Sequence, residues 1–375
     1  MNKYILAMPP QTRATLELQN LFETNGFLAH RVSRFEEHSF YSDNRSFIAD
    51  NRIITFNNTH GQLLALKPDI TLSVAKSAPI SEKGCTKLYY NEHVYRISPD
   101  SDDFDEVPQC GVEVFGELDS YTTYEVVSLA AKSLHMLDKN FSLVISHLAW
   151  LQSVLQLAQI PQEDIGKFIT CVKNKNPHQL AELCGQFGLS SHISCLLNSL
   201  VTIHGSFAQV LPRLAEMQIC SSTTAAYLEL VELWKVLGES AFASKVSFDF
   251  SVVSHLDYYN GLVFRGYIEK SPYVTLSGGR YDMLVKKLRG LSTGAIGFAV
   301  YLDKLNLYYF HSRQWDFDAV VLYDSTAKTA DIVAAKEKLM SKGLTVRVQS
   351  SDATAVSARE VYQVGDDGNC MIVRV

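Results

Sequence analysis

The sequence predicts an α+β fold, in which a mainly antiparallel sheet flanked by helices is interrupted by a helical insert and followed by a small α/β unit. Three observations predict it. Short stretches with strand character occur on both sides of residues 148–237, which instead consist of successive helical segments separated by prolines and a glycine. After Trp315 the pattern changes to strand, helix and strand. Strands that cluster on both sides of a helical insert favour an antiparallel sheet over repeated βαβ units.

The first half of the chain alternates helices and short strands. Pro9 and Pro10 precede a segment whose apolar residues fall close to one helical face, and proline suits a first helical turn because its backbone dihedral is preset. Pro68 and Asp69 open another helix, where an early acidic residue interacts favourably with the helix dipole. The expected helices are 11–25, 69–76 and 121–137, and the expected strands are 52–56, 61–66, 87–96, 111–115 and 141–145.

Strand character returns after the insert, with Gly261 expected at the turn between two strands. The expected strands are 247–253, 262–268, 294–298, 319–323, 343–348 and 371–375, and the expected helices are 280–289 and 329–341. We therefore divide the chain into three parts. These are a core of residues 1–147 and 238–312, a helical insert of residues 148–237, and a small α/β C-terminal domain of residues 316–375.

Composition and charge exclude several classes of protein. The chain has 375 residues, with 34 Lys and Arg against 40 Asp and Glu, so the net charge is −6. No overall basic surface is therefore available to hold nucleic acid. A hydrophobic content of 47% with only 10 prolines and 20 glycines excludes a disordered or collagen-like chain.

The cysteines and the apolar segments indicate where the protein works. Seven scattered cysteines without a C-x-x-C pair form neither a disulfide framework nor a zinc site. The amino terminus carries only a short apolar stretch, and no uncharged apolar run reaches transmembrane length. We expect a cytoplasmic globular protein with no metal, no other cofactor and no membrane partner.

Five acids lie close together in one polar loop. They are Asp100, Asp102, Asp103, Asp105 and Glu106. A calcium loop would need acids at alternating positions, a glycine at the sixth and a distal glutamate, and this spacing differs. A solvated acidic loop is the favoured interpretation.

Three further clusters are weak when each is taken alone. Residues 278–282 (GGRYD) are typical of a tight turn from strand to helix. In 256–261 (LDYYNG), a core strand would place Tyr258 and Tyr259 on opposite faces, so at most one would line a given pocket. In 109–113 (QCGVE), the amide and the carboxylate share one strand face, which suits a small polar pocket, although a solvent-facing strand edge is the favoured interpretation of this motif alone.

Taken in order, these pieces resemble the core of class II aminoacyl-tRNA synthetases, and specifically the histidyl-tRNA synthetase family. The resemblance spans residues 9–310, and five ordered matches are specific in a way that no single match is. The matches are 66–71 (LKPDIT) with L-R-P-E-x-T, 95–96 and 109–116 with motif 2, 256–261 with L-D-Y-Y-T-G, 278–282 with G-G-R-Y-D, and 294–305 with motif 3.

Departures from that family concern the groups that would bind ATP. An arginine-glycine pair is replaced by Ser254 and His255, the motif 3 arginine is Lys304, and a motif 2 glutamate is Ser98. The motif 2 loop, residues 100–106, carries acids and no Lys or Arg. Adenylation needs cations aimed at the phosphates, and each lost donor typically lowers the rate by about 10²- to 10³-fold. Lysine does not supply the planar fork of arginine. We therefore predict no synthetase activity.

The amino-acid pocket of the family, by contrast, is retained. By resemblance, Asp69 with Thr71 and Gln109 holds the ammonium group of histidine, and Arg96 meets its carboxylate in a bidentate pair. Glu113 and Tyr259 bind the imidazole nitrogens, with Tyr258 and Tyr281 beside them. Asp69 replaces the family's longer glutamate, so the affinity is expected to differ from that of an enzyme.

A histidine pocket without an ATP clamp resembles the regulatory subunits of short-form ATP phosphoribosyltransferase. In that family the synthetase-like chain joins a short catalytic subunit, in a hetero-octamer built on homodimers of the regulatory chain. The complex performs the first step of histidine biosynthesis. The resemblance implies a non-catalytic subunit that is required for activity and senses L-histidine for feedback inhibition, without a tRNA partner.

Two alternative hypotheses follow from the same residues. A divergent histidyl-tRNA synthetase or related amino-acid ligase would catalyse histidine-dependent ATP–pyrophosphate exchange. A structural partner with a vestigial pocket would lack histidine binding as well as exchange.

Overall fold

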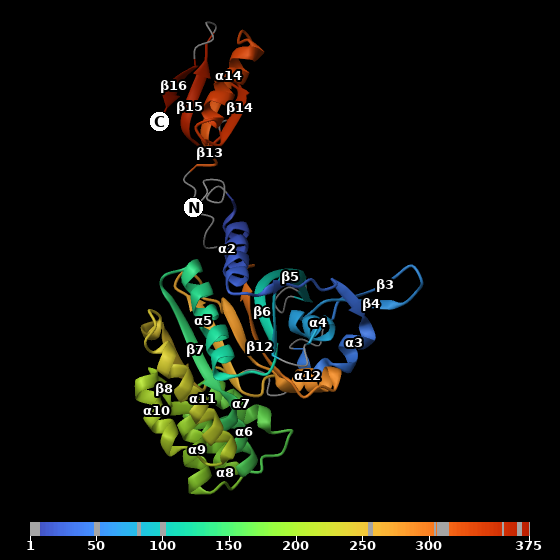
Figure 1. The fold of residues 1–375 in the computed structure, drawn as a ribbon, viewed down its shortest axis with the longest axis vertical. Helices are drawn as coiled ribbons and strands as arrows, with labels where there is room; N and C mark the ends of the chain where they lie inside the picture. The colour runs from blue at the N-terminus through green and yellow to red at the C-terminus, as the bar shows by residue number, and fades with distance from the viewer. Residues whose placement is uncertain are drawn as a thin grey trace. The chain divides into compact units, whose positions relative to one another are not determined.

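The computed structural model describes residues 8–48, 53–80, 84–97, 103–253, 258–303, 305, 315–354, 356–365 and 370–374 (Figure 1). Tertiary contacts divide the chain into two compact units. The larger unit comprises residues 14–305, and the smaller one comprises residues 1–13 with 306–375.

The helices whose bounds were predicted begin within two residues of the expected positions. Asp69 caps the helix that follows it, because its Oδ1 accepts the Leu72 N–H at 2.8 Å. Up to residue 305 the described helices are α2 (Pro10–Thr24), α3 (His38–Asp43), α4 (Ile70–Ser77), α5 (Ser120–Leu137), α6 (Leu148–Leu157), α7 (Ile165–Lys173), α8 (Pro177–Gln186), α9 (Ser191–Thr202), α10 (Phe207–Glu216), α11 (Ser221–Leu237) and α12 (Asp282–Arg289), with short 3₁₀ helices at Arg45–Phe47 and Ala243–Lys245.

A nine-stranded sheet forms the centre of the larger unit. Its order is β1-β5-β6-β12-β11-β10-β7-β9-β8, and only β1–β5 and β7–β9 pair in parallel. The strands are β1 (Leu28–Ala29), β5 (Cys85–Ile97), β6 (Phe104–Gly116), β7 (Phe141–His147), β8 (His204–Gly205), β9 (Val246–Asp249), β10 (Leu262–Ile268), β11 (Leu276–Arg280) and β12 (Gly294–Tyr301). The predicted α+β fold with a mainly antiparallel sheet is therefore confirmed.

Helices pack on the sheet and lie beside both of its ends. Figure 1 shows α6–α11, which we call the helical insert, gathered beside the β7–β9 end, and α3, α4 and α12 at the other end. Phe22 of α2 packs edge-on against Phe298, and Leu134 of α5 lies over Gly266. A small antiparallel sheet lies before α4, in the order β2 (Phe35–Glu37), β4 (Leu63–Leu66) and β3 (Thr55–Asn57).

The C-terminal unit is a separate α/β layer. Its sheet has the order β14 (Val346–Ser350), β13 (Phe317–Tyr323), β15 (Ala358–Val364) and β16 (Cys370–Arg374), and α14 (Thr329–Met340) packs on it. Val321, Leu339 and Val364 lie in its core. Strand β15, which the sequence analysis did not predict, occupies an interior position between β13 and β16.

Several predicted elements differ from the structure, and three of these differences lie close to a cavity of the larger unit. The turn expected at Gly261 does not join two neighbouring strands, because β7 lies between β9 and β10. Strand β9 ends at Asp249 and not at residue 253, and the described residues 258–261 lie outside the strands. Arg280 ends β11, so the helix predicted from 280 begins at Asp282.

Close strand packing makes Gly278 a sensitive position. A Cβ at this residue would lie 2.4 Å from the Gly297 carbonyl oxygen and 2.5 Å from the Phe298 Cβ. We expect Gly278→Ala to lower the free energy of unfolding by about 1–3 kcal/mol, since overpacking against backbone has no easy relief. Urea denaturation measures the loss. The control Gly185→Ala lies in α8 with nothing within 4 Å, and we expect it to be stabilising by about 0.5–1 kcal/mol. Similar stabilities for the two variants would contradict this packing argument.

Candidate functional site

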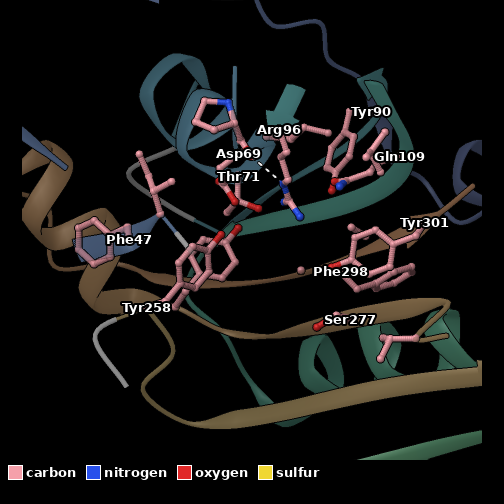
Figure 2. Close-up of a pocket in the computed structure, with 18 of the residues that line it drawn as sticks. Phe47, Asp69, Thr71, Tyr90, Arg96, Gln109, Tyr258, Ser277, Phe298 and Tyr301 are labelled. Carbon is pink, nitrogen blue, oxygen red and sulfur yellow. Dashed lines mark hydrogen bonds between the residues drawn. The ribbon is translucent and has the colours of Figure 1, made fainter. Parts of the chain in front are cut away.

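A cavity of about 910 Å³ lies between the sheet, the start of α4 and residues 258–261 (Figure 2). All eight residues predicted to bind histidine line it: Asp69, Thr71, Arg96, Gln109, Glu113, Tyr258, Tyr259 and Tyr281. They come from five different segments of the chain. The structure thus brings the predicted residues together in one place.

The floor of the cavity is the polar face of β6. Gln109 and Glu113 are 4% and 1% exposed, and they share this face with Gly111. Glycines make the room. Gly297 of β12 lies opposite Glu113 of β6, and a Cβ at Gly297 would lie 1.8 Å from the Glu113 Oε2. A Cβ at Gly111 would lie 2.5 Å from the Tyr90 hydroxyl. A pocket on this face therefore requires both glycines, and the alternative of a solvent-facing strand edge is wrong.

Glu113 is the electrostatic centre of the site. Its Oε1 accepts the Thr71 hydroxyl at 2.6 Å, and its Oε2 accepts the Tyr281 hydroxyl. Burial raises the pKa of Glu113 to about 8, although these two hydrogen bonds oppose the rise. Burial and the nearby Glu113 also raise the pKa of Tyr281 well above its usual range. At neutral pH, Glu113 is accordingly a largely protonated carboxyl group in a buried hydrogen-bonded chain.

Asp69 and Arg96 are the next two ionisable groups of the cavity. Burial raises the pKa of Asp69, whereas its hydrogen bond from the Leu72 N–H and the Arg96 charge oppose that rise. The Arg96 Nε donates to the Pro68 carbonyl oxygen at 3.3 Å. Figure 2 shows its guanidinium group projecting into the cavity. The helix cap occupies one Asp69 oxygen and leaves the other, and the Thr71 hydroxyl donates to Glu113 while its oxygen can still accept a hydrogen bond.

The two tyrosines that follow Asp257 correct one prediction. Tyr258 and Tyr259 both line the cavity, whereas alternate strand geometry would allow only one. Their ring centroids lie 4.6 Å apart at 46°. Because residues 258–261 are not in a strand, the two side chains do not point to opposite faces.

One buried donor in the site has no partner among the described residues. The Gln109 Nε2 is buried without a hydrogen bond in that part of the chain. A buried polar atom left in this way costs free energy, so a ligand acceptor at this position would be favourable.

Several lining residues were not predicted from the sequence. They include Phe47, Tyr90, Asp105, Arg265, Ser277, Tyr301 and Asp303. Arg265 of β10 donates to the Val253 carbonyl oxygen at 3.1 Å and lies opposite Ser277 of the neighbouring strand β11. A lone arginine within the otherwise apolar β10 was the signal that could have identified it.

The acidic cluster differs in part from the predicted loop. Asp105 and Glu106 belong to β6, because β5 and β6 continue as paired strands to Ile97 and Phe104. Asp105 pairs with Arg96 across the strands and lines the cavity, and Glu106 accepts the Tyr95 hydroxyl at 3.1 Å. The structure leaves Asp100, Asp102 and Ser98 undescribed, and the ATP-site positions Ser254, His255 and Lys304 lie outside the described residues too.

Within the described ranges, no group of three or more His, Cys, Asp or Glu side chains could hold a metal ion. Among the helices of the same ranges, none combines the length and apolar character that crossing a membrane needs.

The comparison with known families identifies the class of protein. The histidyl-tRNA synthetase family matches residues 10–305, so the chain belongs to this family. A curated relative from Caldanaerobacter subterraneus subsp. tengcongensis is named ATP phosphoribosyltransferase regulatory subunit. It is 28% identical over 297 residues, covering 78% of this chain and 76% of the relative.

Solved structures show the same fold. An ATP phosphoribosyltransferase regulatory subunit/histidyl-tRNA synthetase from Bacillus halodurans has a TM-score of 0.78 at 21% identity, covering 94% of this chain and 93% of that one. A chain of the ATP phosphoribosyl transferase (HisG:HisZ) complex from Thermotoga maritima has a TM-score of 0.61 at 18% identity, covering 77% and 96%. The predicted class II synthetase-like architecture is therefore confirmed.

The raised pKa of Glu113 predicts a pH-dependent stability. The carboxyl ionises near pH 4.5 when unfolded and near 8 when folded, so its contribution is fully present below pH 4.5 and is lost as the pH rises towards 8. Glu113→Gln removes this loss. Its stability relative to the parent should therefore rise between pH 5 and 8, by at most about 1.4 kcal/mol per pH unit. Urea denaturation at several pH values measures the difference, and parallel pH profiles would contradict a buried protonated carboxyl.

Proposed function

We propose that this chain is the regulatory subunit of a short-form ATP phosphoribosyltransferase and that it binds L-histidine in the cavity. It works with a short catalytic subunit in the first step of histidine biosynthesis, and histidine binding makes the complex sensitive to feedback. The names of curated relatives and the assembly from Thermotoga maritima support this role. The observation that carries the ligand assignment is a cavity with a buried, hydrogen-bonded carboxyl, Glu113, and a guanidinium, Arg96.

Histidine has three groups, and the cavity offers a partner for each. Glu113 and the tyrosines that surround it face the imidazole, and Arg96 meets the carboxylate. Asp69, Thr71 and Gln109 hold the ammonium group through oxygen atoms. The Thr71 hydroxyl also donates to the Glu113 Oε1 at 2.6 Å, so Thr71 contacts both the ammonium group and the carboxyl group that binds the imidazole.

The chain itself is proposed to have no catalytic activity. The sequence replaces the family's arginine-glycine pair by Ser254 and His255 and its motif 3 arginine by Lys304. Asp105 lies opposite Arg96 in the pairing of β5 with β6 and lines the cavity. Its negative charge would repel a triphosphate more strongly than the single carboxylate of histidine, which Arg96 also meets, because like charges repel strongly where water is scarce. This favours binding without adenylation.

The same proposal covers the division of the chain and its assembly. Residues 1–147 and 238–312 form the synthetase-like core, 148–237 the helical insert and 316–375 the C-terminal domain. The subunit is a cytoplasmic homodimer that joins the catalytic subunit in a hetero-octamer and needs no cofactor. The scattered cysteines and negative net charge support a cytoplasmic protein that does not bind tRNA.

A divergent histidyl-tRNA synthetase is the second candidate, because the family match and the complete pocket also suit an enzyme. One sample separates the two functions. We expect calorimetric titration of the purified chain with L-histidine to show saturable, stoichiometric binding, and we expect no histidine-dependent ATP–pyrophosphate exchange. Glu113→Ala should abolish binding, and Glu232→Ala, an exposed α11 position, should not. Exchange at a synthetase-like rate would overturn the regulatory assignment, and absence of binding would leave only a vestigial pocket.

Histidine affinity should depend on pH. Histidine binds best when its imidazole and the Glu113 carboxyl group share one proton between them. The other ionisable groups around Glu113 are Asp69, Tyr90, Tyr258, Tyr259 and Tyr281. Below about pH 6.5 the free imidazole is protonated and binding must release a proton. Above about pH 8 Glu113 is ionised and binding must take one up. We expect affinity to fall about tenfold per pH unit beyond either limit.

Titration calorimetry across pH 5.5–9 in buffers of different ionisation enthalpy tests this dependence. We call the fall of histidine affinity above about pH 8 the alkaline limb. The conservative variant Glu113→Gln should lose it, because the glutamine side chain has no proton to give up. An alkaline limb that persists unchanged in this variant would assign it to another group.

A further inference from the structure

A chain of polar contacts runs from the helical insert to the cavity. It begins at His147, where β7 ends and α6 begins. The His147 Nδ1 accepts the Ala149 N–H at 3.2 Å, which leaves its Nε2–H to donate to the Glu229 Oε2 at 3.2 Å. Glu229 belongs to α11, and its Oε1 lies 3.9 Å from the Arg280 Nη1. One insert carboxylate thus contacts two strand ends of the sheet.

Arg280 passes this contact on to the cavity. Its Nε lies 2.9 Å from the Asp282 Oδ2, and the Asp282 Oδ1 accepts the Ala295 N–H at 2.8 Å. The residue between them, Tyr281, donates its backbone N–H to the Ala295 carbonyl oxygen and its hydroxyl to Glu113. The two charged neighbours of Tyr281 therefore fix the backbone from which its side chain reaches the buried carboxyl.

The same residues hold the tyrosine segment. The Asn260 N–H donates to the Arg280 carbonyl oxygen at 3.0 Å, and the Leu148 N–H donates to the Gly261 carbonyl oxygen at 3.0 Å. A Cβ at Gly261 would lie 3.2 Å from the Arg280 Cδ. The turn after Tyr259 is clamped between the first residue of the insert and the Arg280 side chain.

Glu229 has the charge and the burial to act as the anchor. Its side chain is 24% exposed, beside the buried Leu230. Burial alone would raise the pKa of Glu229, but the His147 hydrogen bond and the Arg280 charge lower it below its usual value. Glu232 lies three residues further along α11 and its side chain is 50% exposed. Among the ion pairs of the described residues, it pairs only with Lys235 on the same helix. Glu229 therefore contacts the ends of two strands, whereas Glu232 contacts a residue of its own helix.

We propose that Glu229 is a positioning residue through which the helical insert sets the geometry of the cavity, by holding Arg280 and, through it, Tyr281 and the turn after Tyr259. This inference rests on the proposed function insofar as the cavity binds histidine. It gives the insert a defined role: a partner or ligand that displaces α11 would change the pocket without entering it.

Glu229→Gln tests the proposal on the full chain, with Glu232→Gln as the matched control on the same helix. We expect Glu229→Gln to weaken histidine binding by about 3- to 30-fold, the range found for residues that act at a distance. The alkaline limb of the affinity profile should also move to higher pH. Loosening Tyr281 removes one of the hydrogen bonds that keep the pKa of Glu113 from rising further. Glu232→Gln should change neither property.

Several outcomes decide the matter. The proposal would be overturned if Glu229→Gln changed neither the histidine affinity nor the pH above which that affinity falls. It would also be overturned if binding became weaker without a shift of that pH, because a general loss of structure has the same effect. If the parent chain does not bind histidine, the proposed function fails. The positioning role is then judged by the Glu113-dependent part of the pH–stability profile, which Glu229→Gln should move in the same direction. If Glu229→Gln does not fold, Arg280→Lys, which keeps the charge but loses the fork, should show the same shift.

Discussion

A carboxyl group buried on the face of an antiparallel sheet is the constraint on which the rest of the site depends. Placing Glu113 there requires Gly297 opposite it, because any side chain would overlap its carboxylate. It also requires two hydroxyl donors, Thr71 and Tyr281, because an unpartnered buried carboxyl is costly. These donors sit at the starts of α4 and α12, so two helix positions follow from one buried group.

Much of this arrangement could be predicted from the sequence. Asp69 after Pro68 indicated a helix start, and the spacing of Gln109, Gly111 and Glu113 indicated one polar strand face. What could not be predicted was the path of the chain between distant strands. Local patterns describe one strand at a time, whereas the position of β7 between β9 and β10 depends on packing in the whole sheet.

The same limit explains the errors at the site. Tyr258 and Tyr259 were assigned to opposite faces because strand alternation was assumed, and the segment turned out not to be a strand. Arg265 went unpredicted because an arginine in a strand usually reaches solvent. Only the tertiary structure shows that it lines a cavity and reaches the Val253 carbonyl oxygen. The residues that line the cavity were easier to predict than the backbone that orients them.

The glycine at position 297 has a consequence for dissecting this protein. The space that a single methyl group would occupy is the space of the buried carboxylate, 1.8 Å away. A methyl group there would also lie 2.4 Å from the Val112 carbonyl oxygen, so Gly297→Ala would displace the Glu113 carboxylate and strain the pairing of β6 with β12 together. The shape of the cavity floor and the pairing of two central strands are thus set by one residue, and neither can be altered without the other.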